Sequence, residues 1–261
     1  MDTWSGAEEE ASSGSDCPIC KGAGFVHPLL PSGKPDYSRV IPCRCTQKEL
    51  EKERQTRLQR YSGLDLELLK NMTFDNFKKR VNLSPELQEN LEQAYQLAID
   101  FAKSPNGWLV FQGVTGCGKT HLAAAIANYR LKAGQPVKFE VVPDLLDHLR
   151  LTFSPESQVS YDHLFEEVKN APLLILDDFG EQSTTPWAQE KLYQVINYRY
   201  NARLATVITT RCSLDEIDSP ISSRLADPKI SVLFNITAPD YRTDATASRK
   251  KITRSQKGRR G

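Results

Sequence analysis

The sequence predicts an α/β protein: a mostly parallel, five-stranded sheet covered by helices, with a small cysteine-rich module ahead of it. Three observations predict this arrangement. From Trp108 onward, short apolar segments alternate with longer segments of helical periodicity, which favours parallel strands joined by helices. A glycine-rich loop at 113–120 lies between one such strand and the next helix. Four cysteines gather within residues 17–45, where periodicity is weak.

The elements follow one another in a regular order. Residues 46–60 favour a helix, residues 63–83 are mixed and predict a linker, and residues 84–242 form the expected core domain. The core begins with a helix from Pro85 to about Phe101. Strands are then expected at 108–112, 137–142, 173–176, 205–209 and 231–237, and helices at 119–132, from about 144, and at 186–201.

Composition and charge narrow the class of protein. The 261 residues are 39% hydrophobic and 26% charged, which suits one large core with an appendage. No apolar run approaches the roughly 18 residues that a membrane span needs. The acidic start of the chain is unlike a secretory signal. We therefore expect a cytoplasmic protein with no membrane partner.

Both ends of the chain have a biased charge. Residues 1–16 carry five acids and no base, whereas residues 247–261 carry seven bases and no acid. This composition predicts a disordered acidic tail over 1–16 and a disordered basic tail over 243–261. The basic tail suits contact with nucleic acid, and equally suits a solvated tail that keeps the protein soluble.

The cysteine-rich module is expected to bind zinc within residues 17–62. Cys17 and Cys20 form a C-x-x-C pair, and Cys43 and Cys45 form a C-x-C pair. Four thiolates suit tetrahedral Zn²⁺ in a closed structural site. In a reducing cytosol, such a cluster indicates a metal site more than disulfides.

Other readings of the cysteines stay open. Free surface thiols or a redox pair would also fit the four residues, and His27 could replace one sulfur ligand. Cys117 and Cys212 lie far from the cluster, and we expect them to take no part in it.

The segment 113–120 reads Gly-Val-Thr-Gly-Cys-Gly-Lys-Thr, the G-x-x-x-x-G-K-T pattern of a phosphate-binding loop. Its glycines let successive backbone N–H groups turn toward phosphate oxygens, and the following helix adds the positive end of its dipole. Lys119 supplies a mobile charge for the β- and γ-phosphates, and the Thr120 hydroxyl can ligate Mg²⁺. We expect ATP to contact Gly113, Val114, Thr115, Gly116, Cys117, Gly118, Lys119, Thr120 and His121.

Two acids follow the apolar run Leu173–Leu176. Ligands bind at the carboxyl ends of strands in open α/β sheets, so Asp177 and Asp178 are candidates for the same site. We expect Asp177 to hold Mg²⁺ through water and Asp178 to polarise the attacking water. A divalent ion would offset the repulsion between the two carboxylates. The alternative is a solvated turn after a strand.

Together these residues resemble the AAA+ branch of P-loop ATPases, and more narrowly the DnaC/DnaI-type helicase loaders and the IstB-like transposition ATPases. Most AAA+ proteins carry Asp-Glu where this chain has Asp177 and Asp178. The similarity covers residues 61–242. It rests on segments 113–122, 173–180 and 221–225, with a similar lead-in at 61–63 and 73–77.

The resemblance implies roles for residues outside these two motifs. Arg224 would be an arginine finger that reaches the γ-phosphate held by a neighbouring subunit, so that hydrolysis depends on self-association. Without the resemblance, Arg224 reads as an ordinary surface arginine. Arg211 stands where the family often has a sensor asparagine, which leaves Thr210 to orient the water. Arg242 could act as a second sensor, although no helical lid domain follows it.

The leading hypothesis is an ATP-binding and ATP-hydrolysing helicase loader in DNA replication. It would contact single-stranded DNA, and its zinc module and the helix at 46–60 would bind a replicative DNA helicase. The alternative is an IstB-like transposition helper acting on duplex DNA, and the cysteine cluster weighs against it. A metabolite kinase would need an acceptor-binding module that is not visible. A nucleotide-binding scaffold without turnover also remains open.

Overall fold

The computed structural model describes residues 17–78, 83–153, 160–180 and 185–242. The two tails expected at 1–16 and 243–261 lie outside the described residues. The chain divides into two compact units, one up to Arg57 and one from Leu58. The division falls within helix α1 (Arg44–Ser62), the helix expected over 46–60.

The larger unit is built on a parallel sheet of five strands, which confirms the predicted fold class. Its order is β4-β5-β6-β3-β7, and every pairing is parallel. Because every neighbouring pair is parallel, the chain must cross over a face of the sheet between strands. The strands are β3 (Trp108–Gly113), β4 (Lys138–Val141), β5 (Leu173–Phe179), β6 (Ala205–Thr210) and β7 (Ser231–Ile236).

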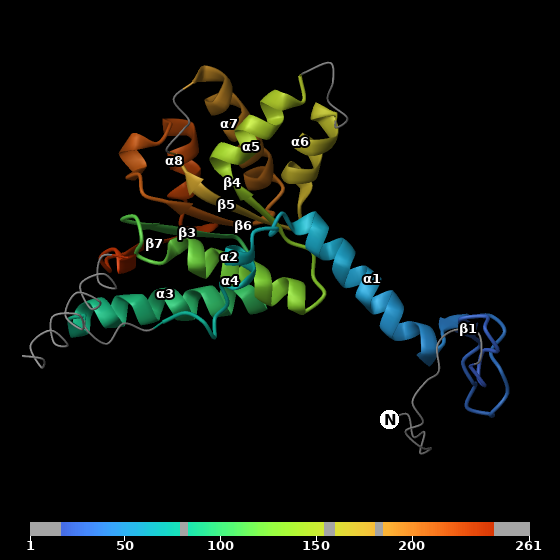
Figure 1. Cartoon of the computed structure of the whole chain (residues 1–261). Helices are drawn as coiled ribbons and strands as arrows, with labels where there is room; N and C mark the ends of the chain where they lie inside the picture. The colour runs from blue at the N-terminus through green and yellow to red at the C-terminus, as the bar shows by residue number, and fades with distance from the viewer. Residues whose placement is uncertain (1–16, 79–82, 154–159, 181–184, 243–261) are drawn as a thin grey trace, which may run out of the picture. The chain divides into compact units, whose positions relative to one another are not determined.

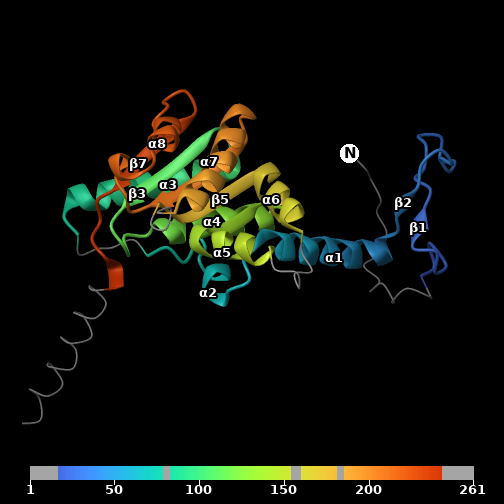
Figure 2. The ribbon, with the colours of Figure 1, turned by 90° about the horizontal axis from the view of Figure 1, so that it is seen from above.

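Helices cover both faces of this sheet (Figure 1). One face carries α2 (Glu67–Lys70), α3 (Pro85–Lys103) and α4 (Lys119–Lys132). Figure 2 looks down on the other face, which carries α5 (Val142–Leu151), α6 (Tyr161–Asn170), α7 (Pro186–Asn201) and α8 (Ser219–Leu225). In the part of the chain that the structure describes, no helix has the length and apolar character to span a bilayer.

The position of strand β5 in the sheet explains the apolar run Leu173–Leu176. Its side chains alternate between two hydrophobic cores, one on each face of the sheet. Leu173 and Ile175 pack with α3 and α4, whereas Leu174 and Leu176 pack on the opposite side. A strand buried on both faces favours apolar side chains, so β5 is apolar from Leu173 to Leu176 and becomes polar only near its carboxyl end, at Asp177 and Asp178.

Two regions differ from the sequence prediction. The described part of 63–83, where a linker was expected, places Leu64 and Leu69 in the core, and Gly63 passes so close to β4 that a Cβ there would lie 2.6 Å from the Phe139 carbonyl oxygen. Helix α6 was not anticipated, because its few apolar residues are embedded among charged ones. Both differences arise from packing against elements distant in the sequence.

Candidate nucleotide-binding site and cysteine cluster

The phosphate-binding loop joins the end of β3 to the start of α4 and borders a cavity of about 590 Å³. The ends of β5 and β6 contribute Asp178 and Arg211 to the cavity wall. The sequence-predicted loop residues Thr115, Gly116, Cys117, Gly118, Lys119, Thr120 and His121 all line the cavity. The structure thus gathers the predicted loop and one of the two predicted acids at the carboxyl edge of the sheet.

The glycines of the loop are required by its backbone and by its neighbours. Gly116 and Gly118 have φ of 75° and 118°, in the left-handed region that other residues rarely adopt. A Cβ on Gly113 would lie 2.5 Å from the carbonyl oxygen of Ile236. Gly113 therefore passes tightly against the end of β7, while Gly116 and Gly118 leave no room for a side chain beside Asp240 and Phe77.

Lys119 is folded back into this loop. Its side chain is buried, and its ammonium donates hydrogen bonds to the carbonyl oxygens of Gly113 (2.7 Å) and Val114 (2.9 Å). The loop itself thereby holds a positive charge at the site where phosphate oxygens would need one.

A β-bulge separates the roles of the two acids. Between β5 and β6 the register gains one residue, so that Asp177 and Asp178 together oppose Thr209. The Thr209 hydroxyl donates to the Asp177 carboxylate (2.6 Å) and accepts the backbone N–H of Asp178 (3.1 Å). As a result Asp177 is buried, while Asp178, with φ of 54°, is exposed toward the cavity.

Burial raises the pKa of Asp177 to about 6. The Thr209 hydroxyl opposes this shift, the charge of Asp178 adds to it, and Thr120 and Lys119 oppose it more weakly. The predicted magnesium ligands Thr120 and Asp177 therefore lie close enough to interact. A buried carboxylate with a raised pKa beside a second carboxylate is a place that a divalent cation would stabilise.

Replacing Asp177 by Asn is expected to stabilise the nucleotide-free protein at pH 8. Raising a carboxyl pKa from 3.8 to about 6 corresponds to about 3 kcal/mol against the ionised form. The folded state then binds more protons than the unfolded state between these pH values, so wild-type stability rises as pH falls through 6. Asp177→Asn should melt several degrees higher at pH 8, and the gap should shrink toward pH 4.

Thermal unfolding of the nucleotide-free proteins at pH 8 and pH 5 measures this. Asp100→Asn, which changes an exposed acid in α3, is the matched control and should follow the wild type. Equal melting of Asp177→Asn and wild type at pH 8, or a gap that widens on acidification, would contradict the expectation.

The hydroxyl of Thr210 is engaged away from the acids. It donates to the carbonyl oxygen of Phe179 (2.7 Å) and accepts the N–H of Cys212 (3.0 Å). The hydroxyl that contacts the acids is that of Thr209, which sequence reasoning passed over. Both threonines stand at the end of β6, and only the bulge in the neighbouring strand determines which of them meets Asp177.

The lead-in segment ahead of the core forms another part of the cavity wall. His121 Nε2 lies 2.9 Å from the carbonyl oxygen of Thr73, so this nitrogen carries the hydrogen and donates. The ring of Phe77 packs edge-on against His121 (5.1 Å) and stacks on Tyr95 (5.5 Å). The cavity-lining residues that the sequence analysis did not assign to the site are Met72, Asn76, Phe77, Lys78, Leu91 and Tyr241.

Arg224 lies outside the cavity of its own chain. Its guanidinium donates to the side-chain oxygen of Asn197 (2.7 Å) and lies over the rings of Tyr193 (5.2 Å) and Tyr200 (5.5 Å). These three residues share one face of α7. Arg242, the candidate second sensor, does line the cavity.

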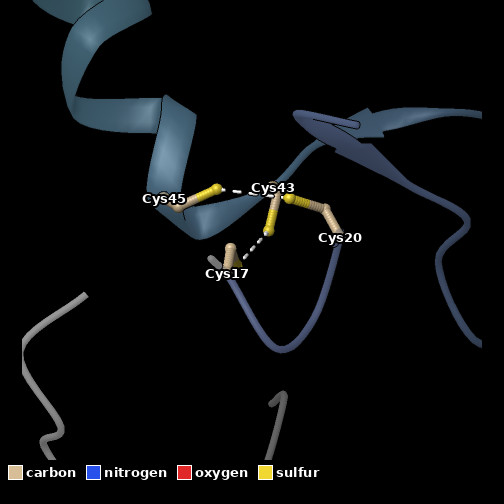
Figure 3. A group of neighbouring side chains, drawn as sticks. All are labelled: Cys17, Cys20, Cys43 and Cys45. Atoms are coloured by element: carbon tan, nitrogen blue, oxygen red, sulfur yellow. Dashed lines mark hydrogen bonds between the residues drawn. The ribbon is translucent and has the colours of Figure 1, made fainter. Parts of the chain in front are cut away.

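The four cysteines of the smaller unit converge on one point (Figure 3). Their sulfur atoms all lie within 4.8 Å of one another. The Sγ atoms of Cys17 and Cys43 are 3.8 Å apart, and those of Cys20 and Cys45 are 3.5 Å apart. Around a tetrahedral zinc ion with Zn–S bonds of about 2.3 Å, the sulfurs would stand about 3.8 Å apart. The cluster therefore fits zinc in donor type, number and spacing.

The surrounding chain explains why the cluster closes. Strands β1 (Phe25–Val26) and β2 (Ile41–Pro42) pair antiparallel and bring the two cysteine pairs together. The N–H of Cys43 donates to the carbonyl oxygen of Gly24 (2.8 Å). Backbone N–H groups lower the pKa of the Cys17 thiol to about 6, whereas burial raises that of Cys45 to about 12. Four adjacent sulfurs cannot all ionise without a cation among them.

Comparison with known proteins decides the family. A family model described as "IstB-like ATP binding protein" matches residues 46–231, more than half of the chain. The chain belongs to this family. The resemblance read from the phosphate loop, the Asp pair and the segment 221–225 is thereby confirmed. The IstB-like family accounts for the phosphate loop and the cavity, and it implies ATP with Mg²⁺ as the ligand of the site.

Curated relatives of this IstB-like chain include "Replicative helicase loader DnaC" from Escherichia coli (strain K12), 29% identical over 160 residues, covering 61% of this chain and 63% of that protein. The protein of the same name from Buchnera aphidicola subsp. Acyrthosiphon pisum is 26% identical over 161 residues, covering 62% and 64%. The match thus spans less than two thirds of the length of either relative.

Solved structures give the same fold. "Crystal structure of the DnaC helicase loader" has a TM-score of 0.54 at 25% identity, covering 66% of this chain and 100% of that one. "Crystal Structure of the DnaI" has a TM-score of 0.52 at 22% identity, covering 67% and 93%, which bears on the fold alone.

The residues present fit ATP and Mg²⁺. The left-handed backbone of Gly116 and Gly118 lets the loop curl, Lys119 supplies the charge, and Asp177 beside Thr120 supplies oxygen donors for a cation. When bound, Mg²⁺ would neutralise charge developing on the phosphates. The protein's own residues would hold the phosphates at the loop, and Asp178 is presented to the cavity.

Proposed function

We propose that this protein is an ATP-hydrolysing helicase loader that acts in DNA replication, in the cytoplasm. The observation that carries the proposal is the joining of a complete phosphate loop to a buried Asp177 and an exposed Asp178 across the bulge. The named DnaC relatives supply the biological setting. In this proposal ATP is a switch that biases assembly on DNA, and hydrolysis resets it.

A pull-down with the full chain as bait, with and without ATP and Mg²⁺, tests the proposal. A replicative helicase should be recovered in a nucleotide-dependent way, and the Lys119→Ala variant should lose that dependence. Recovery of a transposase instead would favour the second candidate below. Recovery that ignores nucleotide would remove the switch from the proposal.

A surface where α5 ends and α6 and α7 begin fits single-stranded DNA. Phe153, just after α5, is 61% exposed and stacks on Tyr161 (5.1 Å). The guanidinium of Arg150 lies over the ring of Trp187 (5.1 Å), and Lys191 lies over Tyr161 (5.7 Å). Phe153 is thus an exposed ring beside two partly buried rings and two cations, and rings interleaved with cations are the features that hold unpaired bases and their phosphates.

Phe153→Ala is expected to weaken binding of a single-stranded oligonucleotide about tenfold, since stacking contributes about 1 to 3 kcal/mol per base. Leu151→Ala is the matched control, because Leu151 is 65% exposed nearby but has no ring on which a base can stack. Fluorescence anisotropy with labelled single-stranded and duplex DNA measures both variants. Equal losses for the two, or no loss for Phe153→Ala, would place the DNA elsewhere.

The smaller unit is the proposed helicase contact. Among its described residues, large apolar side chains stand exposed around the cysteine cluster, including Phe25 (52%), Tyr37 (77%) and Val40 (60%). Helix α1 carries charges of both signs and is exposed along most of its length. Exposed apolar groups beside a mixed-charge helix suit a protein partner better than the uniformly negative surface of DNA.

Self-association through Arg224 completes the proposal. Arg224→Ala is expected to reduce ATP hydrolysis in the presence of DNA and partner at least tenfold while leaving ATP affinity unchanged, because Arg224 lies outside its own cavity. Asp178→Asn should abolish hydrolysis, also with retained binding. Steady-state turnover and equilibrium nucleotide binding separate the two effects. If wild type and both variants are equally inactive, the hydrolysis mechanism is wrong.

The second candidate function is a transposition helper that acts on duplex DNA. The family description favours it, since the matching model is named for IstB-like proteins. The anisotropy measurement above also discriminates here. A preference for duplex over single-stranded DNA would favour the transposition helper, and the reverse preference would favour the loader.

A further inference from the structure

A carboxylate lies directly against the phosphate-binding loop. The four residues Pro239–Arg242, which we call the C-terminal strap, follow β7 and pass along the loop. The backbone N–H of Tyr241 donates to the carbonyl oxygen of Gly116 (2.9 Å). The Asp240 carboxylate occupies the place where a side chain on Gly116 would stand, since a Cβ there would lie 1.8 Å from Asp240 Oδ1.

A hydrogen bond within the strap also fixes its conformation. Asp240 Oδ1 accepts the N–H of Arg242 (2.8 Å), a turn closed by the side chain that fixes the direction of the carboxylate. Tyr241 and Arg242 then face the cavity that the phosphate loop borders. The strap therefore carries two opposite charges at the site: Arg242 lines the cavity, and the Asp240 carboxylate lies against Gly116, in the loop that has to bind the most negative part of the ligand.

We infer that Asp240 opposes polyphosphate binding and so sets how readily nucleotide leaves the loop. This inference rests on the proposed ATP-binding function and deepens it. A negative group next to the cradle repels each phosphate charge, so its effect grows from adenosine to ADP to ATP. A loop without this carboxylate would retain its nucleotide longer. With it, the strap lowers the affinity to a level that permits exchange, which a switch requires.

One substitution at Asp240 changes the charge without changing the hydrogen bond to Arg242. Asp240→Asn removes the charge but keeps the side-chain oxygen that accepts the Arg242 N–H, so the turn can be retained. Asp240→Ser is a second, smaller variant whose hydroxyl can also close the turn. Asp100→Asn removes one exposed acid on α3 and controls for the change in net charge.

Isothermal titration of the full chain with ATP, ADP and adenosine tests the inference. Asp240→Asn and Asp240→Ser should bind ATP about tenfold more tightly than wild type and ADP more tightly by a smaller factor, while adenosine affinity stays unchanged. The gain should decrease as salt increases, because charge repulsion is screened. Asp100→Asn should match wild type at every salt concentration.

The outcomes distinguish failure of the Asp240 inference from failure of the proposed ATP-binding function. If wild type binds ATP and Lys119→Ala does not, yet neither Asp240 variant gains affinity for ATP, the inference is overturned and the proposed function stands. An equal gain for adenosine also overturns it, because the effect would then not depend on phosphate charge. Absence of ATP binding by wild type overturns both.

Discussion

Lys119→Ala should lower the affinity for ATP at least about a hundredfold and leave the fold intact. The Lys119 ammonium is held inside the loop by the carbonyl oxygens of Gly113 and Val114, so the cation stands at the phosphate site before nucleotide arrives. Charge-assisted hydrogen bonds contribute about 1.5 to 3 kcal/mol each, and one or two of them to phosphate account for this loss.

Equilibrium binding of a fluorescent ATP analogue measures the loss, and thermal melting reports the fold. Lys132→Ala is the matched control, because Lys132 is an exposed lysine at the other end of the same helix, α4. It should bind nucleotide like the wild type. Retained micromolar affinity in Lys119→Ala would mean that the loop is not the phosphate site.

Cys43→Ser should reduce bound zinc from about one ion per chain to almost none. Cys43 is the most buried of the four cysteines, at 1% exposed, and its N–H ties the cluster to Gly24. A structural zinc site contributes its binding free energy to folding. We therefore expect the variant's smaller unit to lose its order while the larger unit, with its separate cores, keeps nucleotide binding.

Elemental analysis of the purified proteins gives the zinc content, and limited proteolysis shows which unit opens. Cys212→Ser is the control, since Cys212 lies beside Gly180 in the larger unit and is not one of the four clustered cysteines. It should retain full zinc. Wild-type protein without stoichiometric zinc would rule out the metal assignment altogether.

The fold could be predicted wherever one local rule dominated. Short apolar runs such as Leu173–Leu176 favour central strands, and the loop at 113–120 specifies both the turn and the start of α4. The segment 63–83 could not be predicted in this way. Four leucines lie close together at its start, and only the surfaces of β4 and α4 determine that Leu64 and Leu69 are buried while Leu66 and Leu68 stay exposed.

The residues of the candidate site fall into the same two groups, those that follow from a local motif and those that depend on contacts with distant segments. Lys119, Thr120 and Asp177 follow from motifs, because their spacing along the chain fixes their chemistry. Thr209 and Asp240 do not, because each reaches the site through a contact with a distant segment: a bulge in the neighbouring strand for one, a strap along the loop for the other. Such contacts leave no periodic or motif signal in a single sequence.

The left-handed backbone at Asp178 restricts which residues this position can tolerate. With φ of 54°, the site suits asparagine, aspartate or glycine, and strains longer or β-branched side chains. Glutamate, the usual second acid in AAA+ proteins, would conserve charge here yet disturb the bulge. Asparagine would remove the charge and keep the backbone. At this position, exchange to glutamate keeps the charge but disturbs the structure, whereas exchange to asparagine keeps the structure. An inactive variant is therefore best made as Asp178→Asn.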